Sequence, residues 1–374
     1  MAKDKTKQKS RGSRALKAVI IVLCVLLVLC VGVFVAGYTY WNRLQKAAPT
    51  VEDTMTYDFD DETEPAQLED DHEFAKIYEG DAAGFESYLK EWATNGGELM
   101  YSDDVINVLL IGVDTRNARA IAGLTDSMIL VSVNRALGTI TLTSIMRDSF
   151  AYLEDPDGGG TFNKINSAFP FYGAESLVNT VQDHFKIKID GYAMINFAFF
   201  KAVIDGFGGV TVPVQQYEAD YINSAYGFSV QAGDAVTLNG DEALGFCRSR
   251  NCDSDGDVSR TRRQRQVIIA LLQQAASIQP NEVNDYIKSF LPYFDTSFST
   301  SEIFSYASKA VIGGWARFEV EQYVMPDEES RRAHSGSIWY WAVDYPLAAQ
   351  TLQTAIYGDS NIVLEDDRTS PLDL

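Results

Sequence analysis

The sequence predicts an α/β fold, in which a mixed central β-sheet is flanked by helices, preceded by one transmembrane helix. Three observations carry this prediction. Short apolar runs typical of buried strands alternate with segments of helical periodicity along residues 105–358. Hydrophobic residues make up 46% of the 374 residues, which is enough for a large core. A segment without charge, long enough to cross a bilayer, lies near the N-terminus.

The N-terminal region predicts a membrane anchor. Residues 1–17 are a basic tail, and residues 18–40 contain no charged side chain. Because the basic residues precede the span, we expect a single-pass protein of the cell membrane with a cytoplasmic N-terminus and an extracellular C-terminal domain. The alternative is a cleaved signal peptide, but the run is longer than the apolar core of such a peptide and no A-x-A site follows it.

Charge is spread unevenly along the chain. The formal net charge is -21, and residues 1–46 carry nine Lys or Arg against one Asp, which leaves -29 for the remainder. So acidic a surface excludes nucleic acid as a partner, and an anionic substrate would need a local basic site or a metal ion. Residues 41–104 are predicted to be an acidic stem, extended over Ala47–Glu73 and helical over Phe74–Trp92.

The main domain, residues 105–358, begins with three predicted strands. They cover Val105–Val113, Ser127–Val133 and Thr139–Ile145, and their short connections favour an antiparallel meander. The ends of such a meander bring together Asp114, Asp126 and Arg147. The two carboxylates suit Mg²⁺, which also accepts phosphate oxygens. The alternative is that each carboxylate caps a turn.

The rest of the domain continues the alternation of strands and helices. A glycine-rich loop is expected at Glu154–Gly160, and residues 359–374 are expected to be a C-terminal tail. Strands are predicted at Gly206–Val214, with Pro213 indicating an edge, and at Phe318–Val324. Helices are predicted at Glu175–Phe185, from Asn196 to Asp205, and at Val283–Phe294, Ser301–Gly313 and Tyr345–Tyr357.

The helix after Asn196 is very apolar and is most simply a core helix. A second interpretation is one wall of a tunnel for a long hydrocarbon, with Phe197, Phe200 and Val203 facing the lipid. No P-loop and no dinucleotide-binding glycine motif is present, which argues against nucleotide binding. The cysteines and histidines lack the spacing of a zinc site.

An arginine cluster lies in the stretch Cys247–Gln264. We expect Leu244–Arg250 to be a strand that enters a loop, with Arg248 and Arg250 on one face. A helix is expected from Ser259, in which Arg260 and Gln264 share the face of an apolar stripe. Cys247 and Cys252 bracket the first two arginines, and a disulfide between them is one prediction outside the cell.

Buried arginines need anionic partners, and two kinds are available. The first is a phosphate or pyrophosphate, held by guanidinium forks with Gln264 as a neutral donor. The candidates for this clamp are Arg116, Arg147, Arg248, Arg250 and Arg260. The second is ion pairing with Asp253, Asp255 and Asp257, which we expect to satisfy Arg262 and Arg263 as surface or ion-paired residues.

Several motifs in the same order resemble the LytR–CpsA–Psr family of cell-envelope proteins. The resemblance covers about residues 105–275, and the anchor also fits. Three departures fall on Met146, Ser259 and Cys247, where the family often has Pro, Gly and an aromatic residue. The motifs are NVLLIGVDTR (Asn107–Arg116), TDSMILVSV (Thr125–Val133), SIMRDS (Ser144–Ser149), NKINSAF (Asn163–Phe169), LNGDEALGFCRSR (Leu238–Arg250) and DGDVSRTRRQ (Asp255–Gln264).

The resemblance implies an enzyme that moves a glycopolymer, such as teichoic acid or capsule, from a polyprenyl pyrophosphate glycolipid onto peptidoglycan. It implies Mg²⁺ at Asp114 and Asp126, which with Arg147 form the catalytic group. It also implies the pyrophosphate clamp and a hydrophobic cavity for the polyprenyl chain. Two alternatives stay open: a hydrolase acting on the same lipid carrier, and a non-enzymatic, membrane-anchored lipid-binding or regulatory protein.

Overall fold

The computed structural model describes most of the chain from residue 80 onward. The described residues are 80, 82–113, 125–250, 252–253, 256–275, 295–299, 302, 305–306, 314–335, 338–365 and 367–373. They fall into two compact units. The described parts of Phe74–Phe200, Tyr293–Ser297 and Arg317–Leu374 form the sheet unit, and those of Lys201–Pro292 and Phe298–Ala316 form the arginine unit.

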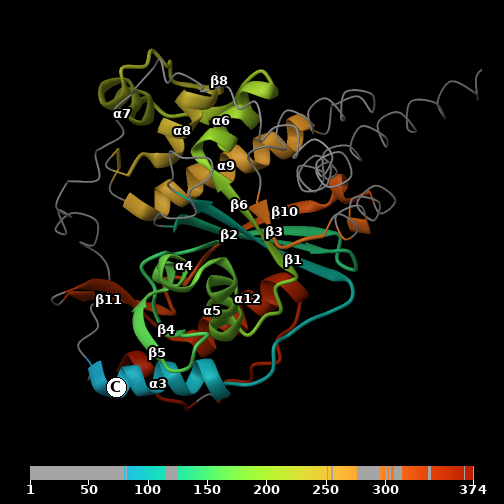
Figure 1. The fold of residues 1–374 in the computed structure, drawn as a ribbon. Helices are drawn as coiled ribbons and strands as arrows, with labels where there is room; N and C mark the ends of the chain where they lie inside the picture. The colour runs from blue at the N-terminus through green and yellow to red at the C-terminus, as the bar shows by residue number, and fades with distance from the viewer. Residues whose placement is uncertain are drawn as a thin grey trace, which may run out of the picture. The chain divides into compact units, whose positions relative to one another are not determined.

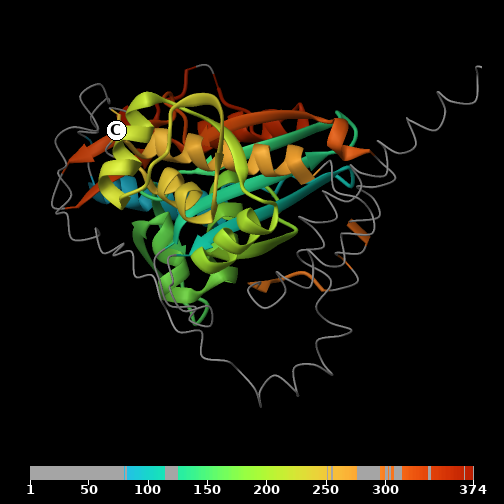
Figure 2. The same cartoon turned by 90° about the horizontal axis from the view of Figure 1, so that it is seen from above.

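A six-stranded mixed sheet is the centre of the sheet unit (Figure 1). In sheet order its strands are β10 (Glu319–Met325), β3 (Thr139–Ile145), β2 (Thr125–Asn134), β1 (Val105–Val113), β6 (Gly191–Asn196) and β9 (Asp295–Thr296). The predicted antiparallel meander of β1, β2 and β3 is confirmed. β6 is parallel to β1, and β10 is parallel to β3, which it flanks although it lies far along the chain (Figure 2).

Helices cover one face of this sheet (Figure 1). They are α5 (Ala174–Phe185) and α12 (Tyr345–Tyr357), which pack on each other, and α3 (Ala82–Asn95) packs against α5. The predictions of α5 and α12 are confirmed, and the predicted stem helix is present from Ala82. The start of α12 follows from its sequence, because the Asp344 carboxylate accepts a hydrogen bond from the Leu347 N–H at 3.3 Å and proline occupies the first turn.

Two antiparallel hairpins complete the sheet unit. β4 (Phe150–Glu154) pairs with β5 (Gly160–Lys164), and β11 (Arg331–Ser335) pairs with β12 (Trp339–Val343). The predicted glycine-rich loop is the connection between β4 and β5. Neither hairpin was expected from the sequence. A short helix, α4 (Ala168–Tyr172), follows β5 after a single 3-10 turn.

Helix α6 (Phe197–Gly206) directly follows β6, as the sequence predicts for the segment after Asn196. The Asn196 carbonyl oxygen Oδ1 accepts a hydrogen bond from the Phe199 N–H at 2.8 Å, which caps the start of the helix. The division between the two units falls within α6.

The arginine unit consists mainly of helices around a two-stranded ribbon. β7 (Val210–Val214) pairs with β8 (Gly233–Leu238), and the register shifts between Val212 and Val214, around Pro213. Proline donates no ladder hydrogen bond, so an irregular position on an edge suits it. The helices are α7 (Gln216–Tyr226), α8 (Gly240–Arg248) and α9 (Gly256–Ala275). The helix predicted from Ser259 is confirmed and begins at Gly256.

The predicted strand at Leu244–Arg250 is wrong, because this segment belongs to helix α8 and the loop after it. The Asn239 side chain accepts from the Glu242 N–H at 3.0 Å, and the Glu242 carboxylate accepts from the Asn239 N–H at 2.9 Å. This reciprocal capping box starts a helix at Gly240. Ala243 through Cys247 are all buried, and a helix buried on most sides shows the continuous apolar run that also suggests a strand.

Replacing Asn239 with alanine is expected to lower the free energy of unfolding by about 1 kcal/mol, because one capping bond of α8 is lost. Asn239→Asp keeps an acceptor oxygen and should stay within a few tenths of a kcal/mol of the unmodified protein. Urea unfolding of the full-length protein measures both. Equal stability of the two variants would contradict a capping role.

Several predictions lie outside the described residues. They are the basic tail, the anchor at residues 18–40, the extended spacer, the helix at Val283–Phe294 and most of that at Ser301–Gly313. Within the part of the chain that the structure describes, we find no helix with the length and apolar character needed to span a membrane.

Two neighbours in α5 have pKa values shifted in opposite directions. His184 is fully buried, its Nδ1 contacts the Thr180 carbonyl oxygen at 2.9 Å, and its Nε2 accepts from the Tyr152 N–H at 3.2 Å. Burial lowers the pKa of His184 from 6.5 to about 4. Burial raises the pKa of the adjacent Asp183 carboxyl from 3.8 to about 6.

Asp183→Asn is therefore expected to make folding acid-sensitive between about pH 6.5 and 4. Below pH 6.5 the unfolded chain protonates His184, whereas the folded protein does so only near pH 4, so stability falls with pH. In the unmodified protein, Asp183 binds a proton more tightly when folded and offsets this loss. Thermal unfolding of the full-length proteins at about pH 7 and 4.5 checks this; equal acid dependence of the two would contradict it.

Candidate functional site

Arg147 lies directly beyond the end of β3, and strand register places Asp126 beside it. In the β2–β3 ladder Ile129 is opposite Ser144, so three further steps along each strand bring Asp126 opposite Arg147. The structure shows the resulting contact, an ion pair between the Arg147 Nη1 and the Asp126 Oδ1. The predicted convergence of these two side chains is confirmed.

Arg147 also contacts the carboxylate next to it. Its Nε lies 3.3 Å from the Asp148 Oδ2, and the Lys164 Nζ lies 2.7 Å from the Asp148 Oδ1. Arg147 and Lys164 retain 22% and 28% exposure, so both cations are reachable from solvent. Arg147 and Lys164 therefore alternate with the carboxylates of Asp126 and Asp148. The Arg147 guanidinium contacts a carboxylate on each of two sides.

The backbone around Arg147 is also held in place. The Met146 N–H donates to the Met325 carbonyl oxygen at 2.7 Å, a bond that the family's frequent proline cannot make. The Asp148 carbonyl oxygen accepts from the Trp341 N–H at 2.9 Å. β10 and β12 therefore fix the Arg147 loop, and Met146 is accommodated without loss of a backbone bond.

Asp114 and Arg116 lie outside the described residues. Val113, the last described residue of β1, is paired with Thr125, which directly precedes Asp126. Asn166, in the same motif as Lys164, donates from its Nδ2 to the Thr125 carbonyl oxygen at 3.3 Å and is itself buried. The end of β2 that carries Asp126 is thus joined to both neighbouring segments.

One of the two predicted magnesium ligands, Asp126, lies at this edge, and its carboxylate is paired with Arg147. Mg²⁺ typically needs one or two carboxylates with water and phosphate oxygens. Among the residues that the structure describes, no group of three or more His, Cys, Asp or Glu could hold a metal by itself. The predicted magnesium site has only two protein ligands, Asp114 and Asp126, so it would not form a group of three.

In the arginine unit, α9 directs several polar residues inward. Arg260 is 3% exposed, and its Nη2 contacts the Asp257 Oδ1 at 2.7 Å. Arg250 is 37% exposed, with its Nε 4.0 Å from the same oxygen. Gln264 is half-buried, and its Nε2 lies 3.5 Å from the Cys247 carbonyl oxygen. The predicted inward face of Arg260 and Gln264 is confirmed, and Asp257 partners Arg260.

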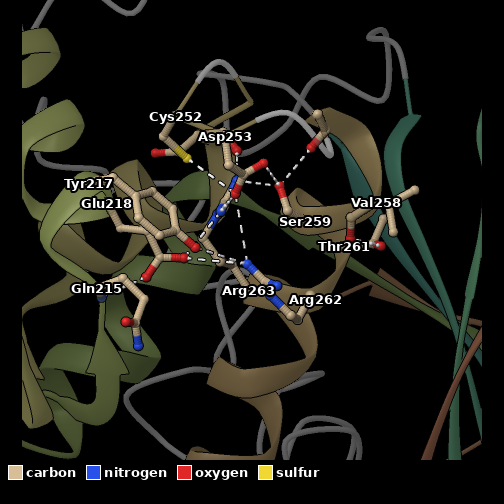
Figure 3. Close-up of polar contacts among 12 residues, drawn as sticks. Gln215, Tyr217, Glu218, Cys252, Asp253, Val258, Ser259, Thr261, Arg262 and Arg263 are labelled. Atoms are coloured by element: carbon tan, nitrogen blue, oxygen red, sulfur yellow. Dashed lines mark hydrogen bonds and ion pairs between the residues drawn. The ribbon is translucent and has the colours of Figure 1, made fainter. Parts of the chain in front are cut away.

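The ion pair predicted between Arg263 and Asp253 is present, but Arg263 is fully buried, which the sequence did not lead us to expect. Its Nη1 lies 3.2 Å from the Glu218 Oε1 and 3.1 Å from the Asp253 Oδ2 (Figure 3). The neighbouring Arg262 is 42% exposed and lies 3.7 to 3.8 Å from the same two carboxylates. Burial acts to lower the pKa of Arg263, but the interactions with Cys252, Asp253 and Glu218 together outweigh it, and the pKa is raised.

Ser259 replaces the glycine that is frequent in the family, and it adds contacts. Its hydroxyl donates to the Asp253 Oδ1 at 2.5 Å and lies 3.1 Å from the Gly256 carbonyl oxygen (Figure 3). The Asp253 carboxylate is therefore shared between Arg263 and Ser259. A glycine could not make either side-chain contact.

The predicted disulfide is absent, and both Cys247 and Cys252 are free thiols. Cys247 is buried within helix α8, whereas the Cys252 thiol lies 3.9 Å from the Asp253 carboxylate. The prediction placed Cys247 on a strand entering a turn, and the helix removes that geometry. Burial raises the pKa of Cys247 to about 12 and of Cys252 to about 11, so neither is a reactive thiolate near neutral pH.

The residues predicted to face a lipid are divided between the interior and the surface of α6. Val203 is buried, whereas Phe197 and Phe200 are half-buried. Phe199 and Ile204 of this helix are also buried. Both the core-helix interpretation and the lipid-wall interpretation are compatible with this pattern.

Sequence reasoning missed Lys164, Glu218 and the burial of Arg263. Lys164 lies in the motif NKINSAF, but its partner Asp148 became visible only through the β4–β5 hairpin. Arg263 carried a local signal, because Val267 and Ala270 follow it at helical spacing and both are buried. The position of Glu218, 45 residues earlier, had no local signal.

Comparison with known proteins agrees with these motifs. A model of the LytR_cpsA_psr family matches residues 75–356. "Polyisoprenyl-teichoic acid--peptidoglycan teichoic acid transferase TagU" of Halalkalibacterium halodurans is 37% identical over 175 residues, 47% of this chain and 55% of the relative. "Biofilm regulatory protein A" of Streptococcus mutans is 33% identical over 227 residues, 57% and 54% of the two chains. The chain spans about half the length of these curated relatives.

A solved structure shows the same fold. The crystal structure of B. subtilis TagT matches with a TM-score of 0.53 and 21% identity, over 70% of this chain and 94% of the other. The fold shared with it is a mixed central sheet flanked by helices. The family match extends from the stem helix to the final helix α12 and includes both arginine groups described above. The chain belongs to the LytR_cpsA_psr family.

Proposed function

We propose that this protein is a phosphotransferase that attaches a polyprenyl-pyrophosphate-linked glycopolymer to peptidoglycan. The observation that carries the proposal is the preorganised Arg147, held between Asp126 and Asp148 at the end of β3 in a chain of this family. The name of the TagU relative favours teichoic acid as the polymer. The family resemblance extends the proposal to Arg248, Arg250 and Arg260 as further cationic groups for a pyrophosphate.

The proposed reaction is a single displacement at phosphorus. A hydroxyl oxygen of a peptidoglycan sugar attacks the phosphorus next to the donor sugar. The bond from that phosphorus to the bridging oxygen breaks, and polyprenyl phosphate leaves with the bonding electrons. The hydroxyl proton passes to a carboxylate, Asp114 or Asp126. Catalysis is then mainly positioning and neutralisation of phosphate charge.

The residues of this chain have distinct proposed roles. Arg147 faces the negative charge that develops on the phosphate oxygens, and its two carboxylate partners keep it oriented. Arg248, Arg250 and Arg260, with Arg116 and Gln264, contact the pyrophosphate. Asp114 and Asp126 would hold Mg²⁺, which supplies further charge neutralisation when bound. Phe197, Phe200 and Val203 contact the polyprenyl chain, and residues 18–40 anchor the protein in the cell membrane.

The test is an assay of full-length protein with a polyprenyl-pyrophosphate-linked glycan and a peptidoglycan acceptor. We expect a phosphodiester-linked product that forms only when acceptor is present. Glycan phosphate released at the same rate without acceptor would instead identify a hydrolase. Tight retention of the lipid without any product would identify a binding or regulatory protein. In cells, deletion of the gene should shift the glycopolymer from the wall to the medium.

A further inference from the structure

The loop that follows α8 is held by a buried side chain of α9. The Arg263 Nη2 donates to the Ser249 carbonyl oxygen at 2.5 Å and lies 3.2 Å from the Ser259 Oγ. Ser249 is fully buried and stands between Arg248 and Arg250 in the chain. The guanidinium of Arg263 therefore holds the backbone between two residues of the proposed clamp.

Gln264 makes a second, longer contact with the same helix end, 3.5 Å from the Cys247 carbonyl oxygen. The last carbonyl groups of an α-helix lack partners within the helix and must find donors elsewhere. Two consecutive residues of α9 thus contact the carbonyl groups on either side of Arg248. This arrangement gives Gln264 a role that does not require a ligand.

The other half of the Arg263 guanidinium is held from a third segment. Glu218 in α7 is 3% exposed, and its Oε1 lies 3.2 Å from the Arg263 Nη1. The other oxygen of Glu218, Oε2, accepts from the Gln215 N–H at 2.9 Å and caps α7. One arginine therefore joins α7, the loop after α8 and the first turns of α9 (Figure 3).

We propose that Arg263 is a positioning residue, which sets the spacing and orientation of Arg248 and Arg250 for the pyrophosphate without contacting the substrate. The proposal rests on the proposed function of these two arginines. Arg263 has 0% exposure and is enclosed by its own partners, so it does not reach a ligand. One nitrogen of its planar fork contacts Glu218 and Asp253, and another contacts Ser249 and Ser259, which a lysine ammonium does not reproduce.

A merely structural role makes a different prediction from a positioning role. Buried ion pairs replaced by apolar or neutral groups often fold as well as the original, because the desolvation cost disappears with the charges. Stability can therefore be restored without restoring the Ser249 contact. If Arg263 only stabilised the fold, substrate affinity would recover together with stability.

The test compares Arg263→Met, Arg263→Lys and the double variant Arg263→Met/Glu218→Gln in the full-length protein. Glutamine at 218 keeps an acceptor for the Gln215 N–H and removes the more deeply buried of the two carboxylates that Arg263 pairs with. The other carboxylate, Asp253, keeps Arg262 and Ser259 as partners. We expect the double variant to regain thermal stability relative to Arg263→Met. Arg263→Met and the double variant should both bind inorganic pyrophosphate at least about tenfold more weakly than the unmodified protein, as measured by calorimetry with Mg²⁺. Both variants should also show a raised KM for the lipid donor.

Arg262→Met is the matched control, because Arg262 is the next residue and approaches the same two carboxylates from the surface. It should leave pyrophosphate affinity and donor KM within about twofold. The proposal would be overturned if the stable double variant, or Arg263→Lys, bound pyrophosphate as tightly as the unmodified protein does. Pyrophosphate binding that depends on Arg263 in a protein without transfer activity would refute the proposed function and leave the positioning role intact.

Discussion

Replacing Arg147 with alanine is expected to reduce glycopolymer transfer by about 100- to 1,000-fold, the range seen when one preorganised charge-stabilising donor is removed. The guanidinium is already oriented by Asp126 and Asp148, so it needs no reorganisation when charge develops on the phosphate. Arg147→Lys keeps the charge but loses the fork and should recover only part of the rate. Initial rates with saturating donor and acceptor measure the effect.

Arg135 provides the matched control for this experiment. It follows β2 in the same unit, is 30% exposed and contacts Asp104 at 3.3 Å. Arg135→Ala should retain nearly full transfer activity. Both pairs are partly exposed, so either substitution should change the free energy of unfolding by no more than about 1 kcal/mol. Near-normal transfer by a folded Arg147→Ala protein would remove Arg147 from the catalytic group.

Replacing Arg263 with alanine is expected to lower the free energy of unfolding by about 3–5 kcal/mol. Glu218 and Asp253 would remain in the interior with their charges uncompensated, and the buried Ser249 carbonyl would lose a donor. Truncation of the side chain also leaves a void that the surrounding helices do not fill. Urea unfolding of the full-length protein, followed by the change in midpoint, measures this loss.

The adjacent Arg262 tests whether burial causes the effect. Arg262 approaches the same carboxylates but is 42% exposed, and its nitrogen is 3.7 to 3.8 Å from their oxygens. Arg262→Ala should cost no more than about 1 kcal/mol, because exposed pairs are screened by solvent. A similar loss of stability in the two variants would mean that the network does not depend on the buried geometry of Arg263.

The central strands were predictable because their signals are local. Val105–Val113 is a largely apolar run and Thr139–Ile145 is rich in β-branched residues, and both strands have these bounds in the structure. The short connections then favoured an antiparallel meander, from which the pairing of Asp126 with Arg147 follows by register. The α8 segment misled the prediction, because a short apolar run is compatible with a buried strand as well as with a buried helix. The capping box at Asn239 was the local signal that decided for a helix.

By itself, the sequence determined the meander of β1, β2 and β3, the edge at which Asp126 meets Arg147, and the inward face of Arg260 on α9. These features depend on backbone periodicity and on short connections, which neighbouring residues specify. Only the tertiary structure decided that Arg263 is interior while Arg262 is exposed. The physical reason is that the burial of a charge depends on its counter-charge, and Glu218 comes from α7, a helix remote in sequence. The structure likewise decided that Cys247 lies within helix α8 and that Cys247 and Cys252 are free thiols.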